Sequence, residues 1–177
     1  MEKVKLNCVG ADVSVFSLSK GNLSRLKEGM FWYEDDTVSF AQIAGKKVKA
    51  VIELIEGHKI YGDLTASQLY DIQEKCLNWD DAKRYFEKFS YPCKENENIV
   101  WYTIKQLQKV FKTYGEVRNA FNVLRKKSRM DLTWSSSFYH FEHKRVYCMG
   151  FVSGYCFDIK CSYAKGCVRP VLEFELQ

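Results

Sequence analysis

Short runs of aromatic and β-branched residues alternate with polar positions over the last third of the chain. Glycine or charged turn residues separate these runs, and this pattern favours strands over helices. We predict three or four short strands that form an antiparallel meander, at residues 134–139, 145–152, 155–160 and 167–176.

The first third of the chain carries weaker strand patterns. Residues 30–33 and 47–55 predict two strands, and a turn at 56–59 predicts a hairpin into residues 60–62. Residues 1–28 show only weak alternation. They form either one or two edge strands or an N-terminal arm that docks on a neighbour, and the pattern leaves both alternatives open.

Helix signals lie between these two regions. Asn78 is suited to cap a helix that runs to about residue 89. Thr103 and Gln106 have the spacing of a capping box, so we expect a second helix to begin there and Gly115 to end it. Apolar spacing predicts a third helix at 116–127.

Two further segments connect the predicted elements. Residues 67–77 predict a short helix or turn, and the polar residues 90–98 predict an exposed loop. Together the elements predict an α+β fold in which two or three short helices flank a twisted antiparallel sheet. With 177 residues, of which 46% are hydrophobic and 15% aromatic, we expect one domain at 29–177 after the arm or edge strands of 1–28.

Charge gives little indication of a nucleic-acid partner. The formal net charge of +5 comes from 27 basic and 22 acidic residues, which are spread along the chain apart from a basic run at 125–129. This run follows a predicted helix, where cations suit the helix C-terminus. A short basic run is a weak footprint of nucleic-acid binding, which we therefore do not predict.

The sequence also shows no pattern typical of a targeting signal or a membrane-spanning helix. No apolar run approaches the roughly 20 residues that a membrane-spanning helix needs, and the first residues lack the apolar segment of a signal peptide. The seven cysteines include no CxxC pair, which favours reduced thiols. We expect a cytoplasmic protein; a phage particle and export without a signal peptide are the alternatives.

The sequence shows no pattern of catalytic or metal-binding residues. The three histidines lack metal-ligand spacing, and serines 135–137 lack a Gly-x-Ser-x-Gly elbow. The acidic run at 34–36 lacks the repeated ligands of a calcium loop. Asp80 and Asp81 are adjacent in a predicted helix and point about 100° apart, so they suit a helix start better than acid–base chemistry. We predict no catalytic residue, no metal site and no cofactor.

Four cysteines near the C-terminus leave three interpretations open. They act as small buried hydrophobic side chains, as ligands of a soft metal or redox groups, or as disulfide partners. We favour the first, because Cys156 and Cys161 would point to opposite faces of one regular strand. The four are Cys148, Cys156, Cys161 and Cys167.

Several motifs resemble the Lcl C-terminal-like family, a branch of the C-type-lectin-like and formylglycine-generating-enzyme fold. They are a Trp-Ser-Ser-Ser strand from Trp134, an aromatic strand that ends at Gly154, and a closing Val-Arg-Pro-Val strand at 168–171. Upstream, Asn78-Trp-Asp-Asp-Ala resembles an early helix of the family, and Trp-Tyr-Thr at 101–103 stands where the family has Leu-Pro-Thr. The resemblance covers residue 29 to the C-terminus. It implies a C-type-lectin-like fold in which Trp134 and Arg169 are structural.

Because no catalytic pattern is present, the aromatic residues between Trp134 and Gly166 are candidates for a binding face. Exposed aromatic side chains provide contact area at low entropic cost, although alternation means that about half of any such set is buried. A wider set adds Phe151 and Phe157 to the candidate ligand-binding residues, which are Phe138, Tyr139, His140, Phe141, His143, Tyr147, Ser153, Tyr155, Asp158, Ser162 and Tyr163.

We therefore expect a non-enzymatic, adhesin-like or receptor-binding module that takes a protein or glycan ligand. The composition of residues 138–163 resembles that of bacterial or phage variable proteins diversified by retroelements. Two alternatives belong to other classes. One is a metal- or thiol-dependent oxidase of the formylglycine-generating type. The other is a structural domain of an assembly, in which residues 1–28 form a docking arm that joins copies of the chain.

Overall fold

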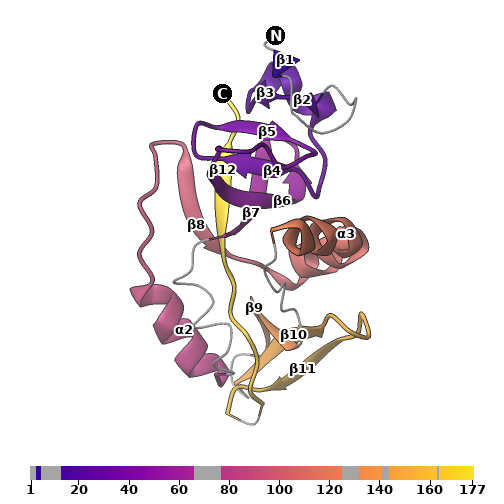
Figure 1. The fold of residues 1–177 in the computed structure, drawn as a ribbon. Helices are drawn as coiled ribbons and strands as arrows, with labels where there is room; N and C mark the ends of the chain where they lie inside the picture. The colour runs from indigo at the N-terminus through magenta and orange to yellow at the C-terminus, as the bar shows by residue number, and fades with distance from the viewer. Residues whose placement is uncertain (1–2, 5–12, 66–76, 125–131, 141–143, 163) are drawn as a thin grey trace.

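The computed structural model describes residues 3–4, 13–65, 77–124, 132–140, 144–162 and 164–177. The fold is α+β, and every strand pairing between the named strands is antiparallel (Figure 1). The predicted segment 67–77 lies almost wholly outside the described residues.

The larger sheet has seven strands in the order β3-β5-β4-β6-β7-β12-β8. Its bounds are β3 Phe16–Ser17, β4 Phe31–Tyr33, β5 Thr37–Ser39, β6 Val48–Glu56, β7 Lys59–Leu64, β8 Glu97–Trp101 and β12 Pro170–Glu175. The predicted hairpin is β6–β7, and Gly57 takes a positive φ of 60° in its turn. Residues 16–17, within the predicted N-terminal segment, form the edge strand of this sheet.

A separate three-stranded sheet has the order β11-β10-β9, with bounds β9 Leu132–His140, β10 Arg145–Gly150 and β11 Cys156–Lys160. These strands form the predicted meander. The fourth predicted strand does not join it. β12 lies instead between β7 and β8 of the larger sheet, and Pro170 stands at its first residue, a strand position where proline is tolerated.

Two further short elements precede the larger sheet's main strands. They are the β1–β2 pair, Lys3–Val4 with Val13–Ser14, and the 3-10 helix η1, Lys20–Arg25.

The loop predicted at 90–98 ends earlier than expected, because Glu97 already belongs to β8 and its buried carboxylate pairs with Lys49.

Helix α2, Trp79–Lys88, begins as the sequence predicts, because the Asn78 side chain accepts a hydrogen bond from the Asp81 amide at 2.9 Å. Helix α3, Ile104–Val123, starts at the predicted capping box of Thr103 and Gln106. It does not end at Gly115. The two helices predicted on either side of this glycine are one helix in the described residues.

Burial explains why α3 continues. Val117, Ala120 and Phe121 lie within two turns beyond Gly115 and pack against Phe31 and Val51 of the larger sheet. A glycine inside a helix costs about 1 kcal/mol relative to alanine, whereas burial of one large apolar side chain contributes about 1.5–3 kcal/mol. Packing therefore outweighs the local stop signal.

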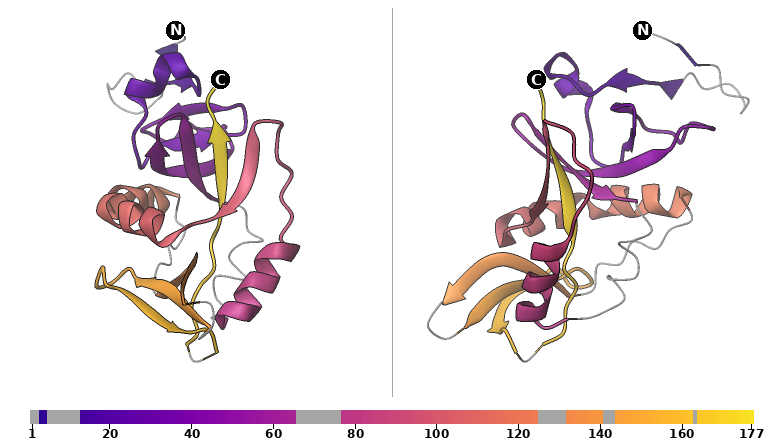
Figure 2. Two further views of the ribbon diagram at one scale, coloured as in Figure 1. Left: turned by 180° about the vertical axis from the view of Figure 1, so that it is seen from behind. Right: turned by 90° about the vertical axis from the view of Figure 1, so that its left-hand side faces the viewer.

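The two helices connect the sheets in different ways (Figure 2). Helix α3 lies between the larger and the smaller sheet, and Leu107 and Val110 contact Tyr61 on one side and Met149 on the other through one buried cluster. Helix α2 instead covers the outer face of the smaller sheet. In the described part of the chain, no helix has the length and apolar character needed to cross a membrane.

The opposite face of the larger sheet holds a second core around Trp32, whose ring meets Phe174 edge-on at a centroid distance of 5.4 Å. Gly62 of β7 lies directly under this ring. A Cβ atom at position 62 would stand 2.8 Å from the Ala50 Cβ and 3.0 Å from the Trp32 ring. This close approach requires glycine.

Two glycine-to-alanine changes should therefore have opposite effects on stability. Gly62→Ala should lower the free energy of unfolding by about 1–3 kcal/mol, because both neighbours are buried and must move. Gly115→Ala should raise it by about 0.5–1 kcal/mol, because the added methyl group meets no atom within 4 Å and favours the helix. Urea denaturation measures both. A stabilised Gly62→Ala protein would contradict this packing.

Candidate functional site

The predicted binding face belongs to the outer part of the three-stranded sheet. Successive residues of β10 point to opposite faces: Val146 and Cys148 join Trp134 in the core under α2, and Tyr147 lies on the other face. There the Tyr147 ring meets that of Tyr139 edge-on, with centroids 5.4 Å apart. Tyr139 keeps 55% of its surface exposed, although it makes this contact.

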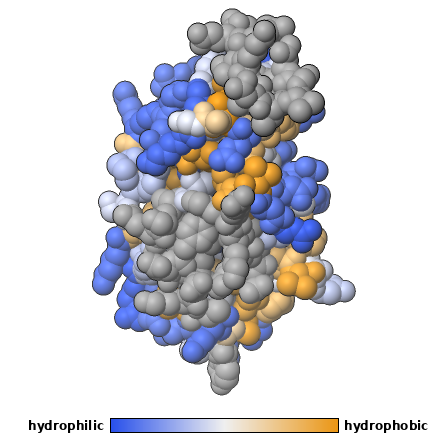
Figure 3. Space-filling view, viewed as in Figure 1, coloured by the Kyte–Doolittle hydropathy of each residue, from blue (hydrophilic) through white to orange (hydrophobic). Residues whose placement is uncertain are grey.

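Further aromatic side chains are exposed at the turn and on the opposite face of the sheet. Tyr155, beside the β10–β11 turn, is 73% exposed. Phe138 and Phe157 are each 40% exposed, but they lie on the face that α2 covers: the Phe138 ring packs against Trp79 at a centroid distance of 4.7 Å, and Phe157 pairs with Cys148. The turn places Val152 in solvent and is allowed by the positive φ of Gly154. Hydrophobic side chains reach the surface in Figure 3 on the side where this turn projects in Figure 1.

The other candidate residues fall into three groups. Ser153 and Ser162 are exposed, and Asp158 is half-buried and forms an ion pair with Arg145 across the sheet. Phe151 does not contribute to the face: it is buried against Phe111 and Tyr114 of α3, because the chain turns inward after β10. The side chain of His140 and the residues Phe141, His143 and Tyr163 lie outside the described residues.

Three tryptophan side chains hold the inner end of this face in place. The buried Trp134 donates its indole N–H to the Leu77 carbonyl oxygen at 2.8 Å. Trp79 donates to the Ser135 carbonyl at 3.0 Å, and Trp101 donates to the Trp134 carbonyl at 2.8 Å. Strand β9 is therefore tied to α2 and to β8 by buried hydrogen bonds, which fixes the position of the exposed aromatics.

The three serines of β9 make structural contacts. The buried Ser135 hydroxyl donates to the Tyr147 carbonyl at 2.8 Å, and the Ser136 hydroxyl donates to the Tyr102 carbonyl at 3.2 Å. The Ser137 hydroxyl accepts a hydrogen bond from the Ile104 amide at 3.1 Å, at the start of α3. These hydroxyl groups join the smaller sheet to the chain that leads into α3.

A buried ionic cluster lies where the two sheets and α3 meet, and the sequence pattern gave no indication of its acidic members. Arg169, just before β12, donates to Glu53 of β6 at 3.0 Å and also pairs with Asp63 of β7. All three side chains are almost fully buried. The Tyr102 hydroxyl is buried beside them and interacts with Glu53.

One arginine faces two carboxylates, so the cluster favours an added proton. Burial raises the pKa of Glu53 to about 7; Asp63 adds to this rise and Arg169 opposes it. Burial also raises the pKa of Asp63. Among the described residues, Glu53 Oε1 and Asp63 Oδ1 receive no hydrogen bond, and this again favours the neutral form of one carboxyl group.

The buried cysteines of the C-terminal region do not have the environment of a reactive thiol. Cys148, Cys161 and Cys167 are buried, and burial raises the pKa of Cys148 to about 12. A reactive cysteine instead has a lowered pKa, because the thiolate is the nucleophile. The half-buried Cys156 accepts a hydrogen bond from Gln108 at 3.4 Å. Within the described ranges, no three or more His, Cys, Asp or Glu residues come together as a metal site.

Comparison with known proteins adds no relative to these observations. No protein-family model matches the chain, and no curated protein or solved structure matches it either.

Because of the buried cluster, we predict that the free energy of unfolding falls as the pH rises. The folded state raises the pKa of Glu53 from 4.5 to about 7, so it binds this proton more tightly than the unfolded state. The resulting stabilisation is fully present below about pH 4.5 and is lost by about pH 7. It amounts to at most about 3 kcal/mol. The free energy of unfolding should therefore be larger at about pH 5 than at about pH 8.

Glu53→Gln should remove most of this difference, because an amide stays neutral in both states. Glu56→Gln is the matched control on the same strand. There burial acts to raise the carboxyl pKa, but bonds from Lys109 and Gln106 outweigh it and lower the pKa. The pH dependence should survive in this control. A wild-type stability that is flat or rises between pH 5 and 8 would contradict the proposed protonation of Glu53.

Proposed function

We propose that this chain is a non-enzymatic binding module that recognises a protein through the outer part of its three-stranded sheet. The observation that carries this proposal is the group of partly exposed aromatic rings on a strand pair whose inner end is fixed. The rings are those of Tyr139 and Tyr147, which meet on one face of the sheet, and of Tyr155 beside the β10–β11 turn.

Physical reasons favour a binding role for these rings. A tyrosine has only two side-chain torsions, so it loses little entropy when it becomes ordered in a complex, and its hydroxyl group can still hydrogen-bond. Contiguous exposed apolar surface is uncommon on a monomeric protein unless it serves an interaction. The rings are held on strands anchored by Trp134 and its hydrogen bonds, so the surface is formed before a partner arrives.

The charges around the rings indicate the chemistry of the partner. Lys144 and Lys160 are exposed at the outer ends of β10 and β11, and Lys165 is exposed after β11. Asp158 and Arg145, which also belong to this sheet, form an ion pair with each other. A partner with an apolar patch and an acidic rim would therefore complement this surface.

The order of elements supports a C-type-lectin-like fold as part of the same proposal. The hairpin β6–β7 is followed by α2 and α3, then by the small sheet, and β12 returns to pair with β7. A diversified protein surface, as in the variable proteins of retroelements, would fit the tyrosine, serine, histidine and cysteine residues of 138–163. A fold alone does not give a function, so the exposed rings remain the basis of the proposal.

Photo-cross-linking should identify the partner. A benzoylphenylalanine replacing Tyr139 should capture one protein in cells of the natural host, whereas the same group replacing Phe40 should not capture it. Phe40 is the matched control, because it is a similarly exposed aromatic residue, at 58%, and follows strand β5 of the seven-stranded sheet. The captured protein is then purified for affinity measurements.

Tyr139→Ala and Tyr147→Ala should each weaken binding of that purified protein at least tenfold, which is about 1.4 kcal/mol. Phe40→Ala should leave the affinity unchanged. Calorimetry of binding measures all three variants. Equal affinities of the Tyr139→Ala and wild-type proteins would contradict the proposal, as would specific binding to a glycan array that these tyrosines do not affect.

A further inference from the structure

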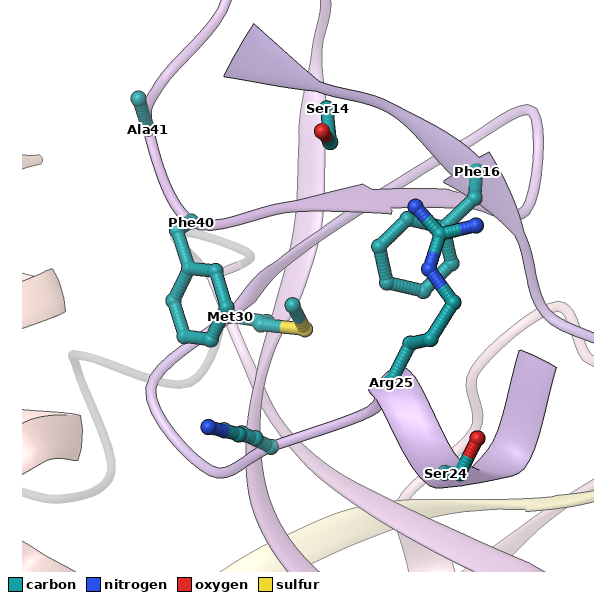
Figure 4. A pocket seen from close by; sticks show the side chains of 8 residues that line it. Ser14, Phe16, Ser24, Arg25, Met30, Phe40 and Ala41 are labelled. Carbon is teal, nitrogen blue, oxygen red and sulfur yellow. The ribbon is translucent and has the colours of Figure 1, made fainter. Parts of the chain in front are cut away.

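A pocket of about 530 Å³ opens at the opposite end of the molecule from the aromatic surface, beside η1 and the edge of the seven-stranded sheet. Figure 4 shows its side chains at close range. Its volume lies within the range of small-molecule sites in proteins. Its lining residues are Ser14, Phe16, Ser24, Arg25, Lys27, Met30, Phe40 and Ala41.

The pocket has an apolar interior. Phe16 and Met30 are buried in the core that lies on this side of the sheet, and Phe40 stands at the mouth with more than half of its surface exposed. In Figure 4 the rings of Phe16 and Phe40 flank the pocket, with the Met30 side chain between them. A flat or extended apolar group could therefore contact side chains on two sides.

Two cations stand at this apolar site. The Arg25 guanidinium lies over the Phe16 ring, 4.1 Å from its centroid, and donates one long hydrogen bond of 3.4 Å to the Asn22 side chain. Lys27 is exposed at the rim. No described carboxylate forms an ion pair with Arg25 or Lys27. The lining contains no acidic residue.

The position of Arg25 suits it for an anion. The Arg25 guanidinium lies over the Phe16 ring, and the N–H groups of a guanidinium point outward in its own plane. Planar guanidinium groups bind carboxylate and phosphate oxygens through such paired N–H groups. The hydroxyl groups of Ser14 and Ser24 add further hydrogen-bonding groups around the pocket.

We propose that this pocket binds an organic anion, namely a carboxylate or phosphate group carried on an aromatic or aliphatic body. The anion is held by Arg25 and Lys27, and the body lies between Phe16, Met30 and Phe40. This site is separate from the proposed protein-binding surface and does not depend on it.

Three naphthalene compounds test the proposal on the full-length wild-type chain. 2-Naphthoate and 2-naphthyl phosphate carry the anion, whereas 2-naphthylmethanol has the same ring system without a charge. Calorimetry should show that at least one of the two anions binds at least tenfold more tightly than the alcohol. If both 2-naphthoate and 2-naphthyl phosphate bind more tightly than the alcohol, the pocket accepts carboxylates and phosphates alike. If only one of them does, the pocket is specific for that anionic group. Equal binding of the alcohol and both anions would overturn the proposal.

Substitutions of pocket residues test whether the anion binds in this pocket. Ser24→Trp should abolish binding of the preferred anion, because a large side chain on the exposed surface of η1 fills the pocket while the core stays intact. Arg25→Gln should remove most of the preference for an anion over the alcohol, and Arg25→Lys should restore part of it. Tyr139→Ala is the control and should bind like the wild type. An unchanged affinity in Ser24→Trp would overturn this assignment.

Discussion

Arg169 is the residue on which the arrangement of the two sheets depends. It is buried between Glu53 and Asp63, which come from the two strands of one hairpin. Without the arginine, two carboxyl groups would remain buried with no cation beside them. Removal of one partner from a buried ion pair typically lowers the free energy of unfolding by about 3–5 kcal/mol. The cluster is thus a strong constraint on which strand can lie beside β7.

The position of Arg169 in the chain explains its effect on the whole fold. Two residues before it, Cys167 accepts a hydrogen bond from Trp134 of the smaller sheet at 2.9 Å. Two residues after it, Val171 pairs with Asp63 of the larger sheet. The chain therefore passes from one sheet to the other at Arg169, and the same junction holds Tyr102 at the start of α3. The exposed aromatic rings rest on this junction.

Local features of the fold could be predicted from the sequence, and distant pairings could not. The caps at Asn78 and Thr103 depend on neighbours three residues away, so their patterns were sufficient. Gly115 misled the prediction, because the buried residues that carry α3 past it contact strands far away in sequence. The return of β12 to β7, and the pairing of Arg169 with carboxylates more than a hundred residues earlier, leave no local pattern.

The same limit applies to the two candidate sites. Alternation indicated that some of the aromatic residues at 138–163 would be exposed, but only the contacts with α3 show that Phe151 is buried. The anion pocket combines residues of η1 with Phe40, which follows β5, and no motif joins them. The molecule thus carries an aromatic surface and an apolar cationic pocket at its opposite ends.

Native-state amide hydrogen exchange, measured at increasing urea concentrations, tests the role of the junction most directly. If Arg169 and its partners unite the two sheets, the amides of β10 and β7 should exchange through one cooperative unfolding with the same free energy and the same dependence on urea. Exchange of the β10 amides through a separate opening, lower by about 2 kcal/mol or more while β7 stays protected, would contradict this account.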